Sequence, residues 1–142
     1  MPRIDFYVLS TKRPHGRELF ACRLIEKAYK LGHQMYIHTE NEAQARLMDD
    51  LLWTFRENSF IPHEKLGQVN QDTPVYIGHK TAPTQLNDIL INMTREVPNE
   101  LTQFSRTIEL VDNDPEIRQQ GRQRFRTYRD QGFQVTTHQV NR

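Results

Sequence analysis

The sequence contains a single cysteine, Cys22, and no long run of apolar residues. One cysteine excludes a framework of intramolecular disulfides and a cysteine-based zinc site, and it favours a reducing compartment. No apolar stretch approaches the roughly 18 residues that a membrane-spanning helix needs. The first residues also lack the charged segment and apolar segment of a signal peptide. We therefore expect a cytoplasmic protein with no membrane partner.

Motifs for nucleotide binding and catalysis are also absent. The loop at 10–16, which follows the first expected strand, contains one glycine and neither a Gly-x-Gly-x-x-Gly nor a Gly-x-x-x-x-Gly-Lys-Ser/Thr pattern. The six histidines are not spaced as metal ligands, and no Gly-x-Ser-x-Gly elbow is present. Cys22 falls inside an expected helix, which favours a packed thiol over a nucleophile. We expect no catalytic residue, no metal and no cofactor.

What is present is typical of one α/β domain over residues 1–142. A chain of this length with 36% hydrophobic residues buries enough surface to fold without a metal or disulfide. Strands are expected at 3–9, 35–38, 59–63, 74–78, 88–93 and 107–111, helices at 17–31, 41–54 and 115–131, a helical turn at 98–104, a loop at 64–73, and a strand or tail at 133–140. The β-α-β-α order with short connections predicts a mostly parallel sheet flanked by helices. Its topology would resemble that of nucleotide-binding domains without their phosphate loop.

Apolar spacing predicts which sides of the first two helices are buried. The first helix is expected to bury Phe20, Leu24, Ala28 and Leu31, and the second to bury Ala43, Leu47 and Leu51, with Trp53 as a further candidate. Thr39 and Glu42 have the spacing of a capping box at the start of the second helix. Asp114 and Pro115 predict the start of the last helix, and Gly132 predicts its end.

The net charge of +1 conceals an uneven distribution along the chain. Residues 115–142 contain six arginines and two acidic residues, a net charge of +4, whereas the preceding residues have a net charge of −3. A basic C-terminal segment on a mildly acidic body indicates that an anionic partner binds there.

The last expected helix contains two parallel stripes. The apolar stripe consists of Ile117, Gly121, Phe125 and Tyr128. The cationic stripe consists of Arg118, Arg122, Arg126 and Arg129. The two stripes lie about 100° apart around the helix. Arginine is preferred where carboxylate or phosphate groups are bound bidentately. Three interpretations stay open: a solubilising face, a nucleic-acid site, or a site for an acidic peptide with an apolar anchor.

Several short motifs resemble the chi subunit family of bacterial DNA polymerase III. In chain order they are Phe6-Tyr7-Val8-Leu9, Leu52-Trp53, Ser59-Phe60-Ile61-Pro62-His63, Asp88-Ile89-Leu90-Ile91, and the run from Arg122 to Phe133. The resemblance covers nearly the whole chain in the same order.

The resemblance implies a non-catalytic accessory subunit of the clamp-loader assembly. Such a subunit pairs with a small psi subunit and binds the acidic, Phe-ended tail of single-stranded DNA-binding protein, so it contacts DNA only indirectly. The implied tail site consists of Trp53, Arg118, Arg122, Phe125, Arg126 and Tyr128. The implied psi site consists of Phe60, Pro62 and His63. If helix 41–54 packs beside the last helix, Trp53 and Tyr128 are expected to wall a recess for the terminal ring.

Two other functions remain open from the sequence. A single-stranded nucleic-acid-binding protein would use the arginine stripe with Phe125, Tyr128 and Trp53 as stacking platforms. The nearly neutral overall charge argues against this interpretation, since such domains are usually basic. A small α/β enzyme without a familiar motif is the third alternative.

Overall fold

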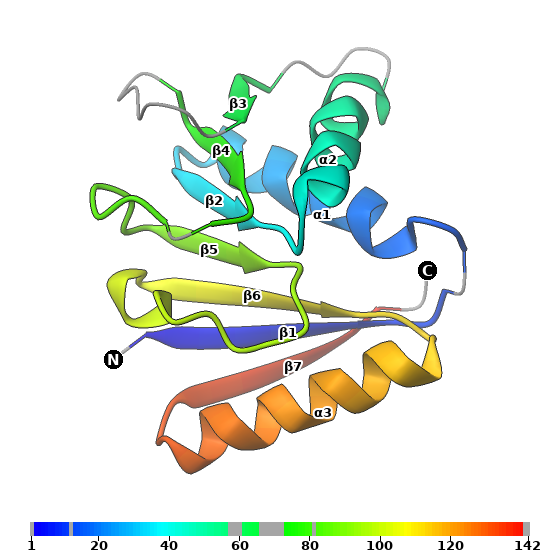
Figure 1. Ribbon diagram of the computed structural model, residues 1–142, viewed down its shortest axis with the longest axis vertical. Coiled ribbons are helices and arrows are strands. Elements are labelled where there is room, and N and C mark those ends of the chain that lie inside the picture. The colour runs from blue at the N-terminus through cyan, green and yellow to red at the C-terminus, as the bar shows by residue number, and fades with distance from the viewer. Residues whose placement is uncertain (1, 12, 57–60, 66–72, 81, 141–142) are drawn as a thin grey trace.

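The computed structural model describes residues 2–11, 13–56, 61–65, 73–80 and 82–140 (Figure 1). The elements follow one another in the order β1 (Arg3–Leu9), α1 (Gly16–Lys30), β2 (Met35–His38), α2 (Glu42–Thr54), β3 (His63–Lys65), β4 (Val75–Gly78), β5 (Ile89–Asn92), η1 (Leu101–Gln103), β6 (Arg106–Val111), α3 (Pro115–Asp130) and β7 (Gln134–Val140). The element η1 is a 3-10 helix. Within these ranges, no helix has the length and apolar character that would let it cross a membrane.

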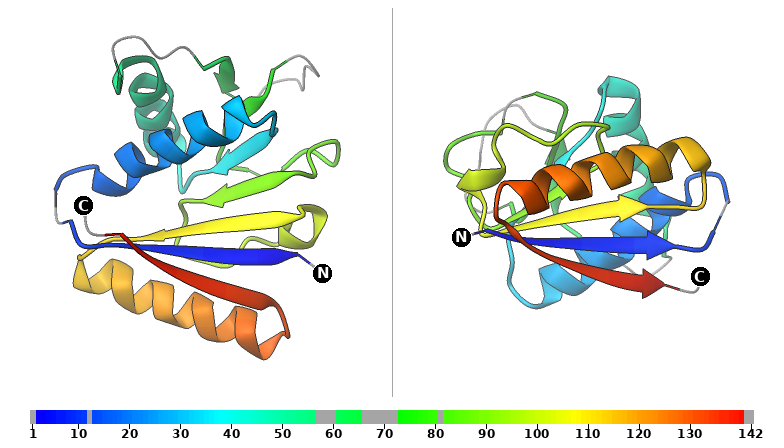
Figure 2. Two further views of the ribbon diagram at one scale, coloured as in Figure 1. Left: turned by 180° about the vertical axis from the view of Figure 1, so that it is seen from behind. Right: turned by 90° about the horizontal axis from the view of Figure 1, so that it is seen from below.

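The seven strands form one sheet in the order β3-β4-β2-β5-β6-β1-β7, and each pair of neighbours is parallel. Helices α1 and α2 lie on one face of the sheet, and α3 lies on the other (Figure 2). The expected α/β class is therefore confirmed, with a sheet that is parallel in all six strand pairings rather than mostly so. A parallel sheet buried on both faces explains the nearly continuous apolar runs in β4 and β5.

The sequence located most elements to within one or two residues. The expected helical turn at 98–104 is η1, and the segment at 133–140 is strand β7 rather than a tail. Of the expected strand at 59–63, residues 59 and 60 lie outside the described residues, Ile61 and Pro62 are not in a strand, and His63 is. Strand β3 begins at His63 and continues to Lys65, so the loop expected from 64 onward was wrong in its first two residues.

Side chains cap α2 and α3 at their first turns. For α3 the prediction is confirmed: the Asp114 carboxylate accepts from the backbone N–H of Glu116 and Ile117. For α2 the capping residue was wrong. Asn41 accepts from the N–H of Gln44, while the hydroxyl of Thr39 donates to the carbonyl of Gly78 on β4. Thr39 is buried against the neighbouring strand, so its hydroxyl is not available to the helix.

The expected buried stripes of α1 and α2 were displaced by one or two positions. Ala21, Cys22 and Ile25 are fully buried in α1, whereas Leu31 is 70% exposed. In α2 the buried side chains are Ala45, Met48 and Leu52 rather than Ala43, Leu47 and Leu51. Small residues on α1 allow the helix to approach the sheet closely, and the larger Phe20 and Leu24 pack at the margin of this contact.

Cys22 lies in this core, as expected for a packed thiol. Burial, with a smaller contribution from the Glu18 carboxylate, raises the pKa of its thiol to about 12. A second cluster lies on the α3 face and includes Ile4, Phe6, Val111 and Tyr128. The sheet therefore separates two cores, each beneath its own helices.

Candidate functional site: an arginine groove on one face and an aromatic surface on the other

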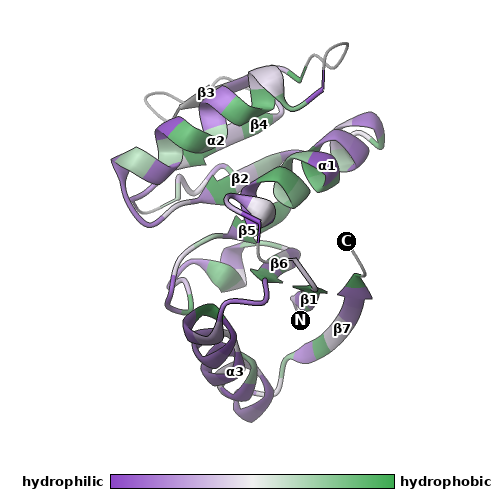
Figure 3. Ribbon diagram, turned by 90° about the vertical axis from the view of Figure 1, so that its right-hand side faces the viewer, coloured by the Kyte–Doolittle hydropathy of each residue, from purple (hydrophilic) through white to green (hydrophobic). Residues whose placement is uncertain are grey.

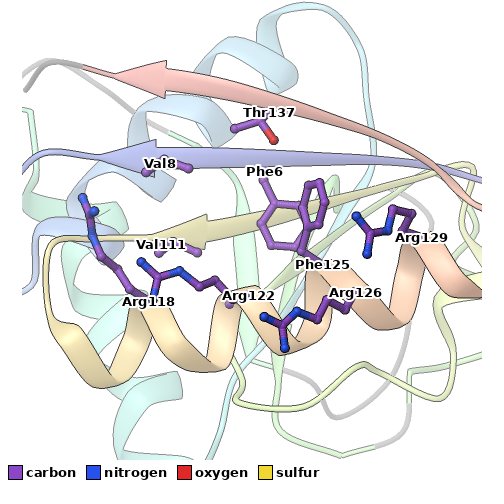
Figure 4. A pocket seen from close by; sticks show the side chains of 10 residues that line it. Phe6, Val8, Val111, Arg118, Arg122, Phe125, Arg126, Arg129 and Thr137 are labelled. Carbon is purple, nitrogen blue, oxygen red and sulfur yellow. The ribbon is translucent and has the colours of Figure 1, made fainter.

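A groove of about 280 Å³ lies between α3 and the strands β1, β6 and β7 (Figure 4). Its floor contains mostly apolar groups, from Phe6, Val8, Val111, Gly121, Phe125 and Thr137. Its cationic groups come from α3 alone and are Arg118, Arg122, Arg126 and Arg129. We call this site the arginine groove. It combines an apolar recess with a row of guanidinium groups, which is the chemistry that the helical spacing predicted.

The four arginines are available to an anionic ligand. Arg122, Arg126 and Arg129 are exposed, and α3 is strongly hydrophilic on its outer side (Figure 3). Arg118 is half-buried, and its Nε donates to the backbone carbonyl of Asp112 at 3.0 Å. In the described part of the chain, no carboxylate lies within ion-pair distance of these four side chains. A ligand carboxylate would thus bind without displacing a carboxylate of the described residues.

The floor of the groove depends on a close approach between α3 and β6. Gly121 makes this approach possible, since a Cβ at that position would lie 2.7 Å from Cγ2 of Val111. The rings of Phe6 and Phe125 meet edge to face, with centroids 5.4 Å apart. Such aromatic pairs contribute stabilisation beyond simple area burial. The recess is therefore shaped by residues of both the helix and the sheet.

A buried polar cluster attaches α3 to β6 beneath the groove. Glu109 is fully buried and accepts from Arg124, Asn92 and Tyr128. The distance from Arg124 Nε to Glu109 Oε1 is 3.0 Å, and Arg124 also donates to the carbonyl of Arg95. Burial raises the pKa of the Glu109 carboxyl even though the Arg124 guanidinium opposes this shift. Because Arg124 and Tyr128 are one turn apart, their two contacts fix the rotation of α3 about its axis.

Tyr128 lies in this buried cluster and does not line the groove. Its side chain is fully buried, its hydroxyl donates to Glu109, and its ring packs beneath Phe6 with centroids 5.9 Å apart. The expectation that Tyr128 walls a ligand recess was therefore wrong. Its apolar spacing indicated correctly that it faces the body of the protein, and the buried carboxylate on β6 explains why it is wholly covered.

Trp53 lies on the other face of the sheet from the arginine groove. The condition that α2 packs beside α3 is not met, because α2 contacts α1, β3 and β4 (Figure 3). Trp53 is 47% exposed, and its ring centroid is 4.4 Å from that of His63. The structure thus separates Trp53 from the arginines with which the resemblance grouped it.

Of the residues expected to face psi, His63 lies against Trp53. Pro62 is half-buried, and Phe60 lies outside the described residues. The His63 side chain is fully covered; its Nδ1 lies 2.6 Å from the carbonyl oxygen of Ile61 and its Nε2 lies 3.2 Å from Asp49 Oδ1. His63 therefore supports the ring of Trp53 rather than presenting its own ring to a partner. We call Trp53, Pro62 and His63 the aromatic surface.

This arrangement also bears on the nucleic-acid alternative. That interpretation requires Phe125, Tyr128 and Trp53 on one surface, but Tyr128 is buried and Trp53 lies beyond the sheet. The three rings do not form a continuous stacking platform.

The strand residues of the groove floor, Phe6, Val8 and Val111, were not predicted from the sequence. Alternation along β1, which places Phe6 and Val8 on the same face, was the signal that would have found two of them.

Comparison with known proteins identifies the family. The family model described as "DNA polymerase III chi subunit, HolC" matches residues 1–136. The chain belongs to this family. The resemblance seen in the short motifs is thereby confirmed over almost the full chain, and a chi subunit is an accessory component of a replicative polymerase.

Two relatives named DNA polymerase III subunit chi align along nearly their whole length. The Pseudomonas aeruginosa protein is 44% identical over 142 residues, covering 100% of this chain and 99% of that protein. The Haemophilus influenzae protein is 32% identical over 140 residues, covering 96% of each chain. A third relative with the same name, from Escherichia coli, is 28% identical over 122 residues, or 84% of this chain and 83% of that protein.

A solved structure with a similar fold is the crystal structure of T4 UvsW. Its TM-score is 0.70 at 10% sequence identity, and the match covers 98% of this chain and 41% of that one. At this identity the match supports the α/β fold of the chi chain alone.

Proposed function

We propose that this chi-family chain binds the acidic C-terminal tail of single-stranded DNA-binding protein in the arginine groove. The observation that supports the proposal is the groove itself, which places an apolar recess beside four arginines without carboxylate partners in the described part of the chain. A tail that ends in acidic residues and phenylalanine presents matching groups: side-chain carboxylates, a terminal carboxylate and one ring.

Each part of the tail has a counterpart in the groove. The terminal ring would enter the recess beside Phe6, Val111 and Phe125, where it loses contact with water. Arg122 lies at the centre of the arginine row and would bind the terminal carboxylate with two parallel hydrogen bonds. Arg118 and Arg126, one turn before and after it, would bind the flanking acidic side chains.

Calorimetry with a short acidic peptide ending in phenylalanine tests this proposal. Arg122→Ala is expected to weaken binding by about 2–4 kcal/mol, since it removes one partner of a close charge pair. The matched control is Arg23→Ala, which removes an exposed arginine from α1 on the other face. A peptide without its terminal phenylalanine should not bind. Equal binding by wild type and Arg122→Ala would contradict the proposal.

The same proposal assigns the aromatic surface to the psi subunit. Trp53 is a large, half-exposed ring supported from beneath by His63, and exposed aromatic residues are frequent hot spots at protein interfaces. With the tail on the α3 face and psi on the α2 face, the chain would bridge the clamp-loader assembly to single-stranded DNA-binding protein.

The bridging function requires no chemistry from the chain itself. Residues 10–16 lack the glycines of a phosphate loop, and the thiol of Cys22 is buried with a pKa raised to about 12. We expect the purified protein neither to hydrolyse ATP nor to bind it tightly. ATP turnover that disappears on replacement of one polar residue would show that an active site exists.

A further inference from the structure

Strand β7 (Gln134–Val140) forms one border of the sheet and pairs with β1 on its inner side. Among the described residues, no strand pairs with its outer side. In a parallel pair, the N–H and C=O of one residue point to the same side, and successive residues alternate. One hydrogen bond between β1 and β7 therefore determines which main-chain groups of β7 face outward.

The hydrogen bond from Ser10 to Val140 sets this alternation. The N–H of Ser10 on the β1 side donates to the carbonyl of Val140 at 3.2 Å, so Val140 faces β1. Every second residue before it also faces β1, which leaves Val135, Thr137 and Gln139 with outward N–H and C=O groups. Side chains alternate as well. Thr137 lines the arginine groove on the α3 face, while His138 reaches Asp5 on the opposite face at 2.9 Å.

Strand β7 itself contains none of the residues that commonly protect an edge strand. Natural edges are commonly blocked by lysine, proline, inward-pointing charges or bulges. The sequence of β7, Gln-Val-Thr-Thr-His-Gln-Val, contains no proline, lysine, arginine or acidic residue. It pairs with β1 without interruption from Gln134 to Val140. The outer border is thus a regular, uncharged template for one more strand.

We propose that the outer border of β7 binds an extended acidic segment as an additional strand, and that this segment directly precedes the residues held in the arginine groove. The inference rests on the proposed function of that groove. The two sites meet at Thr137, whose side chain lines the groove while its main-chain groups face outward. A chain that leaves the recess over Thr137 arrives at the border of the sheet.

Charge identifies the segment as acidic. Arg126 and Arg129 line the end of the groove nearest the C-terminus of α3, are exposed, and have no carboxylate partner in the part of the chain that the structure describes. An added strand gains affinity from main-chain hydrogen bonds, and its alternate side chains give it selectivity. Acidic side chains on the α3 face of the added strand would lie toward these two arginines.

Two peptides of different length distinguish binding at the outer border of β7 from binding in the arginine groove alone. The short peptide has three acidic residues and a terminal phenylalanine, and the long peptide has five further residues at its N-terminus. We expect the long peptide to bind about fivefold to tenfold more tightly, as a few additional main-chain hydrogen bonds would provide. A long peptide with N-methyl groups on alternate amides keeps its charge but loses donors, and it should bind like the short one.

The matched protein variants are Gln139→Pro and Gln139→Ala. Gln139 is exposed and its N–H points outward, so proline removes an outward donor and keeps the ladder to β1 intact. Gln139→Pro should reduce affinity for the long peptide to near that of the short one, and Gln139→Ala should not. Circular dichroism verifies that both variants remain folded. If proline unfolds the protein, the N-methylated peptide on wild-type protein decides alone.

The outcomes distinguish this inference from the proposed function. Short and long peptides that bind equally, with affinity dependent on Arg122, would overturn the strand addition and leave the groove intact. If the N-methylated long peptide binds like the unmethylated one, the gain comes from charge and not from strand pairing. Failure of both peptides to bind would overturn both proposals. A wild-type dimer in sedimentation experiments without peptide, together with a monomeric Gln139→Pro variant, would show that a second copy occupies the border instead.

Discussion

The two faces of the sheet present opposite kinds of candidate surface. The arginine groove lies beneath a 16-residue helix, contains four cationic side chains, and is hollowed to about 280 Å³. The aromatic surface lies where the end of α2 meets the three-residue strand β3, and its main exposed group is the ring of Trp53. A cationic groove selects its ligand by the sign and position of the ligand's charges. An exposed ring selects its partner by the shape of the apolar surface that covers the ring. The comparison indicates that one small domain presents two independent surfaces, so damage to one face should leave the other functional.

The largest effect on stability is expected for Arg124→Ala, which disrupts the buried cluster under the groove and so tests whether the two surfaces are independent. Arg124→Ala leaves Glu109 fully buried without its cationic partner, and this is expected to lower the free energy of unfolding by about 3–5 kcal/mol. Urea denaturation measures the loss. At low temperature, where the variant remains folded, the α3 face should bind the tail peptide poorly while the Trp53 face binds psi normally.

A double variant provides the control for this prediction. Glu109→Gln combined with Arg124→Met removes both charges, while an amide oxygen at position 109 can still accept from Asn92 and Tyr128, so this double variant should recover part of the lost stability. If Arg124→Ala unfolds with the same midpoint as wild type, the buried pair neither anchors α3 nor fixes its rotation.

Trp53→Ala tests whether a change in the aromatic surface leaves the arginine groove unaffected. It should weaken psi binding by about 2 kcal/mol or more, as expected for an interface hot spot. It should leave tail-peptide affinity unchanged, because Trp53 lies on the opposite face from α3. Leu31→Ala is the matched control, since Leu31 is a large apolar residue that is 70% exposed at the end of α1. Equal loss in both variants, or loss of peptide binding in Trp53→Ala, would contradict the assignment.

Gly121→Ala is expected to have a smaller effect, and it tests whether the shape of the groove floor matters for peptide binding. Overpacking against Val111 is expected to cost about 1–3 kcal/mol, and the higher helix propensity of alanine returns up to about 1 kcal/mol. A net loss of about 1 kcal/mol in thermal unfolding should accompany weaker peptide binding. Val111→Ala in the same chain relieves the clash but also removes part of the recess wall, so the double variant should recover stability and only part of the peptide affinity. If Gly121→Ala binds the peptide as wild type does, the shape of the groove floor does not contribute to binding.

Local signals in the sequence predicted the order and class of the elements well. The capping of α3 by Asp114 and the arginine spacing on that helix depend on neighbours within one or two turns, so both were predicted correctly. The capping of α2 was wrong because Thr39 bonds to β4, a contact between residues 39 apart in sequence. Such contacts follow from strand order, which one sequence does not reveal.

The same reasoning explains what was missed at the candidate site. The spacing of α3 predicted an apolar face and a cationic face, but it did not reveal that Glu109 on β6 lies beneath Tyr128. Nor did it place α2 and α3 on opposite faces, which depends on how each connection crosses the sheet. Trp53 was therefore assigned to the wrong neighbourhood, although its exposure on α2 makes it a candidate for binding a partner.

The smallest effect is expected at Arg118 and compares two arginines within the same row. Arg118 already donates to the carbonyl of Asp112 and lies at the end of the groove, whereas Arg122 lies at its centre. A partly solvated pair of this kind contributes about 0.2–1 kcal/mol, so Arg118→Ala should weaken peptide binding far less than Arg122→Ala. Added salt screens exposed charges more than covered ones, and the difference between wild type and Arg118→Ala should shrink as salt increases. Arg118→Lys retains the charge and should bind nearly as wild type does. Calorimetry at low and high salt measures all three proteins. If Arg118→Ala proves as damaging as Arg122→Ala at every salt concentration, the terminal carboxylate lies at the Arg118 end, and the orientation assigned to the peptide must be reversed.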